Sequence, residues 1–320
     1  MTEPTPLLLA AAFFSAGMVT CFLTPAVIAL AARLGAVDEP RGRRLHAEPT
    51  PLWGGLAIMG GWGVGLAFAL GFGARLGLVR DLTGLQVAGI VTGCVVIAVI
   101  GGADDRFDLR PLPKLLGQIA AAAIALACGV RVVGLLGHPV GPVIGGLVTV
   151  VWIVAVVNVI NFMDGLDGLA AGISAIAALT FAGIAASRGH VGAAVFATCI
   201  AGACIGFLPY NFNPARVFMG DLGSHFLGYA IAAVAIVGTA KIAATAALAS
   251  TVLVLGLPIG DTALVVLRRY RNGQSIAHGD RQHLHYRLLD SGLSQRKAVL
   301  VLYAVSIAFS LLAVLLSRFA

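Results

Sequence analysis

Long apolar runs separated by short polar segments dominate the hydrophobic pattern of this chain. An α-helix rises about 1.5 Å per residue, so an apolar run of roughly 17 to 25 residues is long enough to cross a bilayer. Ten runs of about this length occur, and each predicts one transmembrane helix. Their approximate limits are 5 to 33, 52 to 72, 84 to 103, 114 to 130, 143 to 160, 166 to 187, 190 to 210, 222 to 238, 241 to 268 and 296 to 317.

The composition indicates a membrane protein and excludes a soluble globular domain. Hydrophobic residues make up 59% of the 320 residues and charged residues only 11%, and the mean hydropathy is +0.97. The first run has little charge before it and no clear small-residue cleavage site, so we expect a retained helix and not a removed signal peptide. No internal repeat or separate soluble domain is visible. We therefore predict an all-α polytopic integral membrane protein of about ten transmembrane helices, with residues 1–320 as one domain.

Positive charge gathers on one side of the predicted membrane. If the N-terminus lies outside, the loops on the other side hold fifteen of the 21 Lys and Arg residues, and the positive-inside rule places those loops in the cytoplasm. Twelve of the 14 acidic residues fall on the same side, which the rule does not require. The topology and anionic lipid account for the net charge of +7, so we predict no nucleic-acid partner. Any chemistry is expected in the cytoplasmic loops.

The five cysteines all lie inside apolar runs, with Ala, Ile, Val and Gly as neighbours. Their number is odd, and we interpret them as small buried hydrophobic residues and not as a disulfide framework or a metal cluster. They are Cys21, Cys94, Cys128, Cys199 and Cys204.

A polar group lies at the cytoplasmic end of the fifth apolar run, in the sequence NFMDGLDGL. Asn158, Asn161 and Asp164 are three residues apart, so they form a drifting polar stripe on a helix, and Asp167 follows them. Each carboxylate inserted into a membrane costs about 2.5 to 3.5 kcal/mol on insertion scales. Asparagine alone could hold neighbouring helices together. Two Asn and two Asp within ten residues favour a functional site.

Two further cytoplasmic loops carry acidic residues at helix ends. Asp104 and Asp105 close the third apolar run in GGADDRFDLRPLPKLLGQ, with Lys114 nearby. Adjacent carboxylates repel, so this pair calls for a cation or a proton, unless it is simply a solvated helix end. In YNFNPARVFMGDLGS, Asp221 lies in a glycine-flanked turn and Phe218 precedes it by three residues. The Phe218 ring either stacks on a nucleobase or anchors the chain in the membrane.

Two basic loops complete the cytoplasmic side. The loop DEPRGRRLHAEPTPLWGG contains Arg44 and His46, and its arginines are either substrate contacts or a topology anchor. The last and longest loop holds Arg281, His283 and His285. Two histidines at this spacing could bind zinc, but no cysteine or third nearby ligand supports such a site. Arginine together with histidine suits a phosphate or a sugar phosphate better.

The grouping of carboxylates, amides, lysine and basic loops on one membrane face predicts a metal-assisted phosphoryl transfer. Oxygen ligands without cysteine favour Mg²⁺ or Mn²⁺, and Mg²⁺ binds one or two carboxylates together with substrate phosphates. A lipid-borne phosphate would be a natural second substrate. Two alternatives come from other classes. A transporter should place its ionisable residues near the bilayer midplane, and a non-catalytic lipid-binding scaffold would not explain the Asn and Asp cluster.

Four motifs, in this order, resemble those of the polyprenyl-phosphate N-acetylhexosamine-1-phosphate transferases. They are DDRFDLRPxxKLLGQ, NxxNxxDGLDGLA, NPARVFMGDLGS and the histidine-containing DRQHLHYRLL. The similarity extends from Asp38 to about Lys297, which is most of the chain. It implies a multi-pass enzyme of the bacterial inner membrane with its active site facing the cytoplasm. Such enzymes move a sugar 1-phosphate from a UDP-N-acetylhexosamine to polyprenyl phosphate, releasing UMP and forming a polyprenyl-diphosphate-sugar.

The last loop separates two branches of this family. DRQHLHYRLL and PIGDTALVVLRR are similar to the N-acetylglucosamine-1-phosphate branch, which makes the first lipid intermediate for O-antigen, teichoic acid or arabinogalactan. The alternative, the phospho-N-acetylmuramoyl-pentapeptide type, usually carries three consecutive histidines there. Tyr286 stands where the favoured branch usually has its last histidine, so the role of that imidazole does not transfer. The UDP-sugar, the prenyl length and the pathway stay open, and a homodimer is one option for the assembly.

The resemblance also implies roles for individual residues. Asp221, with Asn161 as a second ligand, would hold Mg²⁺ against the pyrophosphate, and Asp104 or Asp105 would accept a proton from the polyprenyl phosphate. That demand is light, because a phosphate monoester has a second pKa of about 6. Asp164 completes the catalytic group. The substrate-binding residues would be Arg44, His46, Lys114, Asp167, Asn211, Phe218, Arg281, His283 and His285.

These contacts divide between the parts of the two substrates. Lys114 would pair with phosphate oxygens, Asp164 and Asp167 would orient the pyrophosphate and the uridine, and Phe218 would stack on uracil. The last loop would contact the sugar phosphate through Arg281, His283 and His285. Direct displacement by the polyprenyl phosphate is the expected route, and a covalent phosphoryl-Asp intermediate is the alternative.

Overall fold

The computed structural model describes residues 4–39, 49–135, 138–239, 255–271 and 284–317. Two pairs of two-residue antiparallel strands lie between helices, β1 (Val37–Asp38) with β2 (Thr50–Pro51) and β3 (Gly134–Leu135) with β4 (His138–Pro139). The helices are α1 (Pro4–Leu34), α2 (Gly54–Arg75), α3 (Gly84–Phe107), α4 (Pro111–Ala127), α5 (Pro142–Met163), α6 (Leu169–Ser187), α7 (Val191–Asn211), α8 (Gly220–Thr239), α10 (Gly256–Arg271), α11 (Leu284–Asp290) and α12 (Gln295–Ser317). The predicted all-α class is confirmed for the described part of the chain.

Eight of the described helices are long and apolar enough to cross a membrane. They are α1, α2, α3, α5, α6, α7, α8 and α12, and each lies on one of the predicted apolar runs. α4 is also apolar but has only 17 residues. Much of the predicted run 241 to 268 falls outside the described residues, and its last part lies in α10. The protein is therefore a polytopic integral membrane protein, as predicted.

Local sequence signals set several helix ends. Thr83 begins α3 with a capping box, because its hydroxyl accepts from Gln86 N at 3.1 Å while Gln86 Oε1 accepts from Thr83 N at 3.0 Å. Pro111 and Pro142 stand in the first turns of α4 and α5, where a helix needs no N–H donor. Gly168, with φ of 81°, makes the left-handed turn from α5 into α6.

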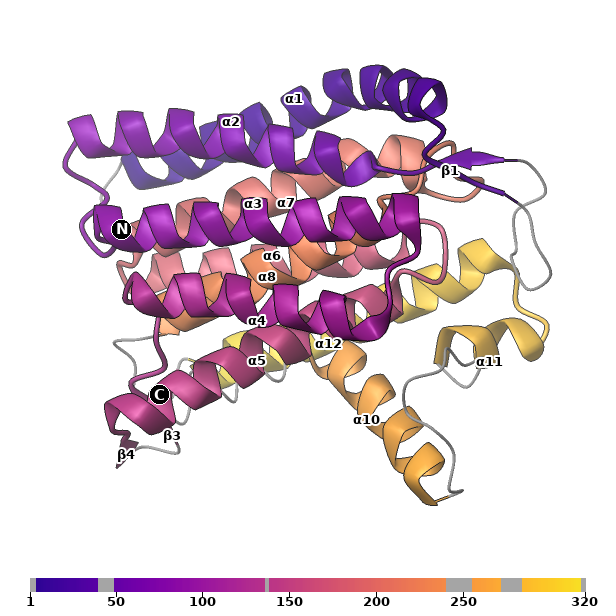
Figure 1. Ribbon diagram of the computed structural model, residues 1–320. Coiled ribbons are helices and arrows are strands. Elements are labelled where there is room, and N and C mark those ends of the chain that lie inside the picture. The colour runs from indigo at the N-terminus through magenta and orange to yellow at the C-terminus, as the bar shows by residue number, and fades with distance from the viewer. Residues whose placement is uncertain (1–3, 40–48, 136–137, 240–254, 272–283, 318–320) are drawn as a thin grey trace.

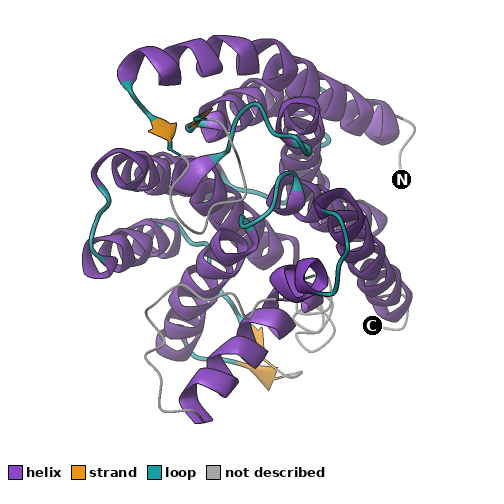
Figure 2. Cartoon of the chain, turned by 90° about the vertical axis from the view of Figure 1, so that its right-hand side faces the viewer, coloured by secondary structure: helices purple, strands orange, loops and turns teal. Residues whose placement is uncertain are grey.

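Helices α6, α7 and α8 form the centre of the bundle. In α7 and α8, 89% of the apolar segment is buried, against 28% in α1 and α12. α1 and α2 pack against α7, α3 and α5 pack against α8, and α12 packs against α6. Figures 1 and 2 show this arrangement from two directions. The helix that carries Asp221 is thus held between neighbours on several sides.

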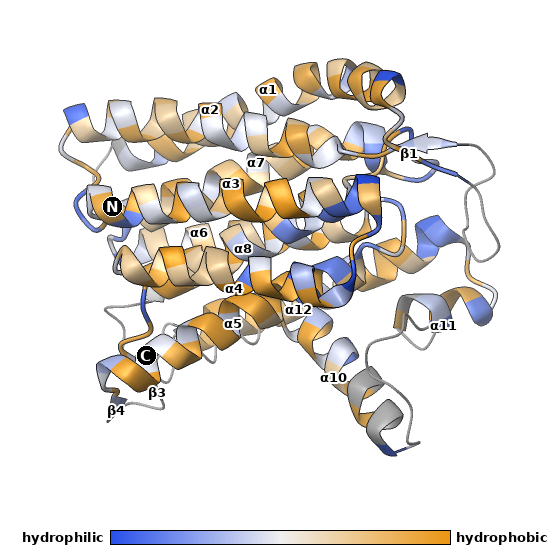
Figure 3. Ribbon diagram, in the orientation of Figure 1, coloured by the Kyte–Doolittle hydropathy of each residue, from blue (hydrophilic) through white to orange (hydrophobic). Residues whose placement is uncertain are grey.

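Large apolar side chains cover the outside of the bundle. Leu7, Phe22, Val143 and Leu311 are among the exposed ones, and Figure 3 shows hydrophobic colour along most of the length of the helices. Lipid tails accept such a surface, whereas a monomer in water rarely exposes one of this extent.

Polar residues gather at one end of the bundle, near β1 (Figures 1 and 3). Successive helices alternate in direction, so the described connecting residues 35–39, 49–53, 108–110, 164–168 and 212–219 all lie at this end. α12 begins there, with α11 packed against it, and α10 leans away from the bundle (Figure 1). Segments far apart in the sequence therefore meet where the predicted site residues lie.

Candidate active site

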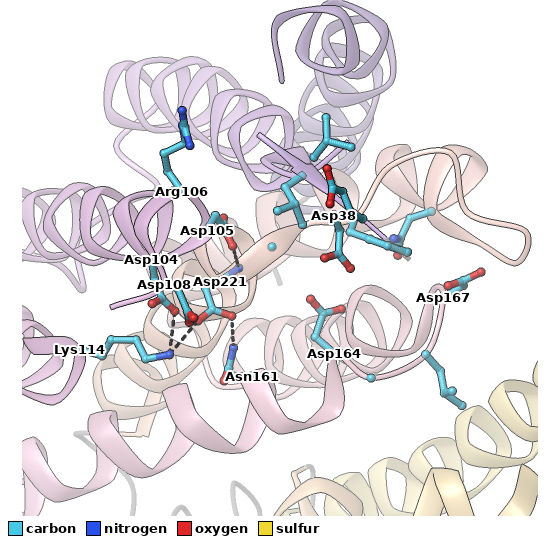
Figure 4. Close-up of a pocket in the computed structure, with 18 of the residues that line it drawn as sticks. Asp38, Asp104, Asp105, Arg106, Asp108, Lys114, Asn161, Asp164, Asp167 and Asp221 are labelled. Atoms are coloured by element: carbon cyan, nitrogen blue, oxygen red, sulfur yellow. Dashed lines mark hydrogen bonds and ion pairs between the residues drawn. The ribbon is translucent and has the colours of Figure 1, made fainter. Parts of the chain in front are cut away.

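A pocket of about 840 Å³ opens at the polar end of the bundle (Figure 4). This volume is typical of small-molecule sites. The described residues that line it include eight acidic side chains and two basic ones, Arg106 and Lys114. Because like charges repel, a nucleotide diphosphate would enter this pocket only in the company of cations. Nine predicted residues line the pocket, namely Asp104, Asp105, Lys114, Asn161, Asp164, Asp167, Asn211, Phe218 and Asp221.

Lys114 joins two carboxylates of the pocket. Its Nζ lies 2.7 Å from Asp104 Oδ2 and 3.4 Å from Asp221 Oδ2. The other Asp104 oxygen accepts from Leu109 N at 2.7 Å, between the end of α3 and the start of α4. Both Asp104 oxygens are therefore engaged, and this carboxylate orients the ammonium. Asp221 is the more distant partner of Lys114 and keeps the capacity to bind a second cation.

Asn161 fixes the other side of Asp221. Its Nδ2 donates to Asp221 Oδ1 at 2.8 Å and to Ser224 Oγ at 2.9 Å. The amide nitrogen thus faces the carboxylate, and the part of Asn161 as a metal ligand stays a prediction. A half-turn of the amide would bring its oxygen beside the carboxylate, which only a cation between them would stabilise. Ser224 is absent from the predicted site, although its spacing of three from Asp221 puts it on the same helix face.

Asp105 caps helix α8 from the neighbouring α3. Its Oδ1 accepts from Asp221 N at 2.7 Å and its Oδ2 from Leu222 N at 3.2 Å. The first N–H groups of a helix have no partner within it, so this carboxylate satisfies two of them. Gly220, with φ of 71°, permits the approach because a Cβ there would strike Asp105. Asp105 therefore positions Asp221, and its part in proton transfer stays a prediction.

Asp164 faces the pocket (Figure 4) and takes no hydrogen bond from any described residue. Burial raises the pKa of its carboxyl well above the usual range, and the charges of Asp221, Asp105 and Asp167 raise it further. A carboxylate perturbed in this way inside a cleft is a candidate for direct contact with a substrate or a metal.

Asp167 uses one oxygen to hold the loop that connects α7 to α8. Its Oδ2 accepts from Asn213 Nδ2 at 2.9 Å and from Ala215 N at 3.0 Å. The other oxygen takes no hydrogen bond from any described residue, and Asp167 lines the pocket. Asp167 therefore combines a positioning role, which the sequence does not predict, with an acceptor that stays available to a ligand.

Asn211 and Phe218 come from the same connection. The buried Asn211 side chain accepts from Gly168 N at 3.1 Å and donates to Val217 O at 2.9 Å. Its amide joins the α5–α6 turn to the α7–α8 connection and leaves little capacity for a substrate. Phe218 lines the pocket, and its carbonyl accepts from Gly54 N at 2.9 Å, which anchors the segment to α2.

Four predicted substrate contacts, Arg44, His46, Arg281 and His283, lie outside the described residues. His285 lies in α11, but its side chain is also outside the description. The roles of these five stay predictions. Tyr286, which stands where the N-acetylglucosamine-1-phosphate branch usually has a histidine, lines the pocket.

Other polar residues near the site carry weak sequence signals. His225 Nε2 lies 4.0 Å from Asp221 Oδ2, one turn along α8, and the spacing of four could indicate it. Gln295 lines the pocket from α12 with no local pattern that marks it. Asn158 does not line the pocket, because its Nδ2 donates to Gln118 Oε1 at 2.7 Å and joins α5 to α4.

The donor set fits a hard divalent cation that a substrate helps to bind. Among the described residues, no three His, Cys, Asp or Glu side chains form a complete metal site. Mg²⁺ characteristically takes one or two protein carboxylates and completes its shell with water and phosphate oxygens. Asp221 is the carboxylate that we expect to bind the cation. Lys114 Nζ lies 3.4 Å from Asp221 Oδ2, which shows that a positive charge is stable at this position.

Comparison with known proteins gives one family. The model of glycosyl transferase family 4 matches residues 87–239. A Bacillus subtilis protein named as a probable undecaprenyl-phosphate N-acetylglucosaminyl 1-phosphate transferase is 35% identical, over 95% of this chain and 84% of its own. The decaprenyl-phosphate N-acetylglucosaminephosphotransferase of Mycobacterium tuberculosis is 39% identical, over 90% of this chain and 78% of its own. This chain belongs to glycosyl transferase family 4.

The family 4 match runs from α3 to the end of α8 and contains Asp104, Lys114, Asn161, Asp164 and Asp221. A Salmonella typhi protein named undecaprenyl-phosphate alpha-N-acetylglucosaminyl 1-phosphate transferase is 26% identical, over 87% of this chain and 76% of its own. Membership in glycosyl transferase family 4 confirms the resemblance found in the motifs. The transporter alternative gains no support, because the pocket acids lie at one end of the bundle.

Proposed function

We propose that this member of glycosyl transferase family 4 transfers N-acetylglucosamine 1-phosphate from UDP-N-acetylglucosamine to polyprenyl phosphate and releases UMP. Relatives named for this activity cover most of the chain. One observation supports the proposal most strongly. The side chains of Asp104, Lys114, Asn161 and Asp221 line one pocket at the polar end of the bundle. A reaction between a soluble nucleotide and a lipid phosphate requires a site at the surface of the membrane, where both substrates can reach it.

One phosphorus–oxygen bond replaces another in the proposed reaction. An oxygen of polyprenyl phosphate attacks the β-phosphorus of UDP-N-acetylglucosamine. The bond from this phosphorus to the bridging oxygen breaks, and that oxygen leaves with UMP. The second pKa of a phosphate monoester is about 6, so the nucleophile is largely ionised at neutral pH and needs no strong base. Positioning and neutralisation of charge are the main tasks of the protein.

The described residues divide these tasks. Asp104 holds the Lys114 ammonium, which would pair with phosphate oxygens. Asp105 holds the start of α8 and so sets the position of Asp221. Asp221 and Asn161 would hold a Mg²⁺ or Mn²⁺ ion, which when bound neutralises pyrophosphate charge and favours the departure of UMP.

The proposal places the protein in a bacterial plasma membrane with the pocket in the cytoplasm. The similar relatives are bacterial. Among the described residues, four Lys or Arg lie at the other end of the bundle, against eight at the pocket end, namely Arg33, Arg106, Arg110, Lys114, Arg216, Arg287, Arg296 and Lys297. By the positive-inside rule, this excess supports a cytoplasmic pocket. The homodimer stays a prediction.

Purified protein with UDP-N-acetylglucosamine and a short polyprenyl phosphate tests the proposal. We expect Mg²⁺-dependent release of UMP together with a lipid diphosphate-sugar, both lost in EDTA and restored by Mg²⁺ or Mn²⁺. UDP-N-acetylgalactosamine and UDP-N-acetylmuramoyl-pentapeptide serve as parallel substrates. Faster turnover of the pentapeptide would move the protein to the other branch. Failure of the folded protein to release UMP from any of the three would overturn the proposal.

A further inference from the structure

Gln295, the first residue of α12, belongs to a hydrogen-bond chain in the pocket wall. Asn213 Nδ2 donates to Asp167 Oδ2 at 2.9 Å and to Gln295 Oε1 at 2.9 Å. Arg296 Nε donates to Asn213 O at 2.8 Å and holds the same loop to α12. Three separate segments, the α5–α6 turn, the α7–α8 loop and the start of α12, therefore meet at one asparagine.

The donors and acceptors in this series of hydrogen bonds set the orientation of the Gln295 amide. Asp167 Oδ2 also accepts from Ala215 N at 3.0 Å, so it is an acceptor and Asn213 must present nitrogen to it. The same nitrogen supplies its second hydrogen to Gln295, which must therefore present oxygen. The Gln295 nitrogen, Nε2, is left on the opposite side of its amide.

Gln295 Nε2 is buried and finds no hydrogen-bond partner in the part of the chain that the structure describes. A buried N–H group without a partner is unfavourable, and native proteins retain few of them. Gln295 lines the 840 Å³ pocket. A bound molecule with a carbonyl oxygen at this place would satisfy the amide.

Asp167, the other hydrogen-bond partner of the Asn213 side chain, provides an acceptor. Asp167 Oδ1 receives no hydrogen bond from the described residues, and Asp167 lines the pocket with Gln295. Asn213 holds one oxygen of each residue, so the remaining two atoms, a donor on Gln295 and an acceptor on Asp167, flank this asparagine. The wall thus offers a donor–acceptor pair with a fixed assignment.

Uracil is the part of a UDP-sugar that fits such a pair. Its N3–H lies on the same ring edge as its two carbonyl oxygens and points in nearly the same direction. The acetamido group of the sugar also has an N–H and a C=O, but in a trans amide these point in opposite directions. Cytosine has an acceptor at N3 and an amino donor at C4, so at the same ring position it would set like groups against each other.

We infer that Gln295 Nε2 donates to a carbonyl oxygen of the uracil ring while Asp167 Oδ1 accepts its N3–H, so that Gln295 selects uridine over cytidine diphosphate sugars. The inference rests on the proposed function. Phe218, which lines the pocket from the same loop, supplies an aromatic face for the ring. Gln295 is thus a specificity residue, and Asn213 is a positioning residue that acts through it.

Kinetics of the full-length protein with UDP- and CDP-N-acetylglucosamine test the inference. Gln295→Glu keeps the oxygen that Asn213 binds and replaces the donor by an acceptor. We expect the ratio of kcat/KM for the UDP-sugar to that for the CDP-sugar to fall about tenfold or more, because the nucleobase hydrogen bond is lost. Gln295→Met, which has no donor, should weaken use of the UDP-sugar without improving the CDP-sugar.

A binding measurement keeps the test independent of turnover. UMP should protect the wild-type protein against thermal unfolding more strongly than CMP does, and Gln295→Glu should remove this difference. Gln86→Glu is the matched control, since Gln86 caps α3 at the end of the bundle away from the pocket. An unchanged UDP to CDP ratio in Gln295→Glu, with wild-type protein releasing UMP, overturns the inference alone. Absence of UMP release by the wild-type protein overturns the proposed function.

Discussion

The Asp105 carboxylate accepts a hydrogen bond from the Asp221 backbone nitrogen at 2.7 Å. Asp105 therefore sets where α8, the helix that carries Asp221, begins. The second Asp105 oxygen accepts from Leu222 N at 3.2 Å, so the whole carboxylate is committed to the first turn of α8. The adjacent Asp104 is instead bound to Lys114 at 2.7 Å. The two neighbouring carboxylates thus have different tasks, one through the backbone and one through an ammonium.

Asp105→Asn should lower kcat about tenfold to hundredfold and lower the free energy of unfolding by about 1 to 3 kcal/mol. The amide keeps one acceptor but sets an NH₂ group against the second backbone N–H, which shifts Asp221. UMP release and thermal unfolding in detergent measure both effects. Asp81→Asn is a matched control, because Asp81 accepts from Gly192 N at 2.7 Å and Ala193 N at 3.1 Å and caps α7 at the other end of the bundle. It should lose stability and retain kcat, and an equal loss of kcat in both variants would contradict the positioning role.

Asp221→Asn should reduce turnover by about a thousandfold or more, and added Mg²⁺ should not restore it. The substitution removes the charge that would attract the cation but leaves the size of the side chain almost unchanged. A Mg²⁺ titration of UMP release from micromolar to tens of millimolar checks this outcome. Ser224→Ala, which removes only a neighbour of Asn161, should retain most activity. Wild-type kinetics in Asp221→Asn would refute its assignment to the metal.

The fold is predictable because bilayer thickness translates directly into the length of an apolar run. The predicted run 190 to 210 becomes α7 (Val191–Asn211), and the predicted run 84 to 103 lies within α3 (Gly84–Phe107). Polar residues at the end of α3, such as Asp104, extend this helix beyond the apolar limit. Hydropathy alone does not predict that a helix continues through such a polar last turn.

The gathering of the site residues is also predictable, since alternating helices bring every second loop to one face. The partners of each residue are not. Adjacent residues on a helix point about 100° apart, so Asp104 and Asp105 reach different neighbours. Asn161 bonds to Asp221 while Asn158, three residues earlier, bonds to Gln118 on α4. These differences depend on which helix packs on which face, and no local pattern carries that information.

Lys114→Ala should raise the KM for UDP-N-acetylglucosamine about tenfold or more while lowering the Mg²⁺ concentration at half-maximal rate. The ammonium would contribute a charge-assisted contact to the substrate phosphates. It also lies 3.4 Å from Asp221 Oδ2, where it opposes a second cation. Initial rates over a grid of substrate and Mg²⁺ concentrations separate the two effects. Lys297→Ala, at an exposed site on α12, is the control, and unchanged kinetics for both substrates in Lys114→Ala would remove this residue from the mechanism.

Asp164→Asn should be more stable and less active than the wild-type protein at neutral pH. The pKa of the Asp164 carboxyl in the folded protein is well above its usual range, mainly because of burial. The folded state therefore holds a proton that the unfolded chain releases above a pH of about 4. Stability falls as the pH rises from there through the folded-state pKa. Asparagine cannot ionise, so the variant escapes this loss.

The difference in unfolding temperature between Asp164→Asn and the wild-type protein should be close to zero near pH 4 and should grow with pH to about 2 °C or more. Thermal unfolding in detergent over a pH series measures it. Mg²⁺ should narrow the difference, because a cation near Asp164 relieves the repulsion on the Asp164 carboxylate, which only the wild-type protein carries. Asp290→Asn, at an exposed carboxylate at the end of α11, is the matched control and should show no such trend. A difference between Asp164→Asn and the wild-type protein that does not change with pH would show that Asp164 does not oppose folding through its charge.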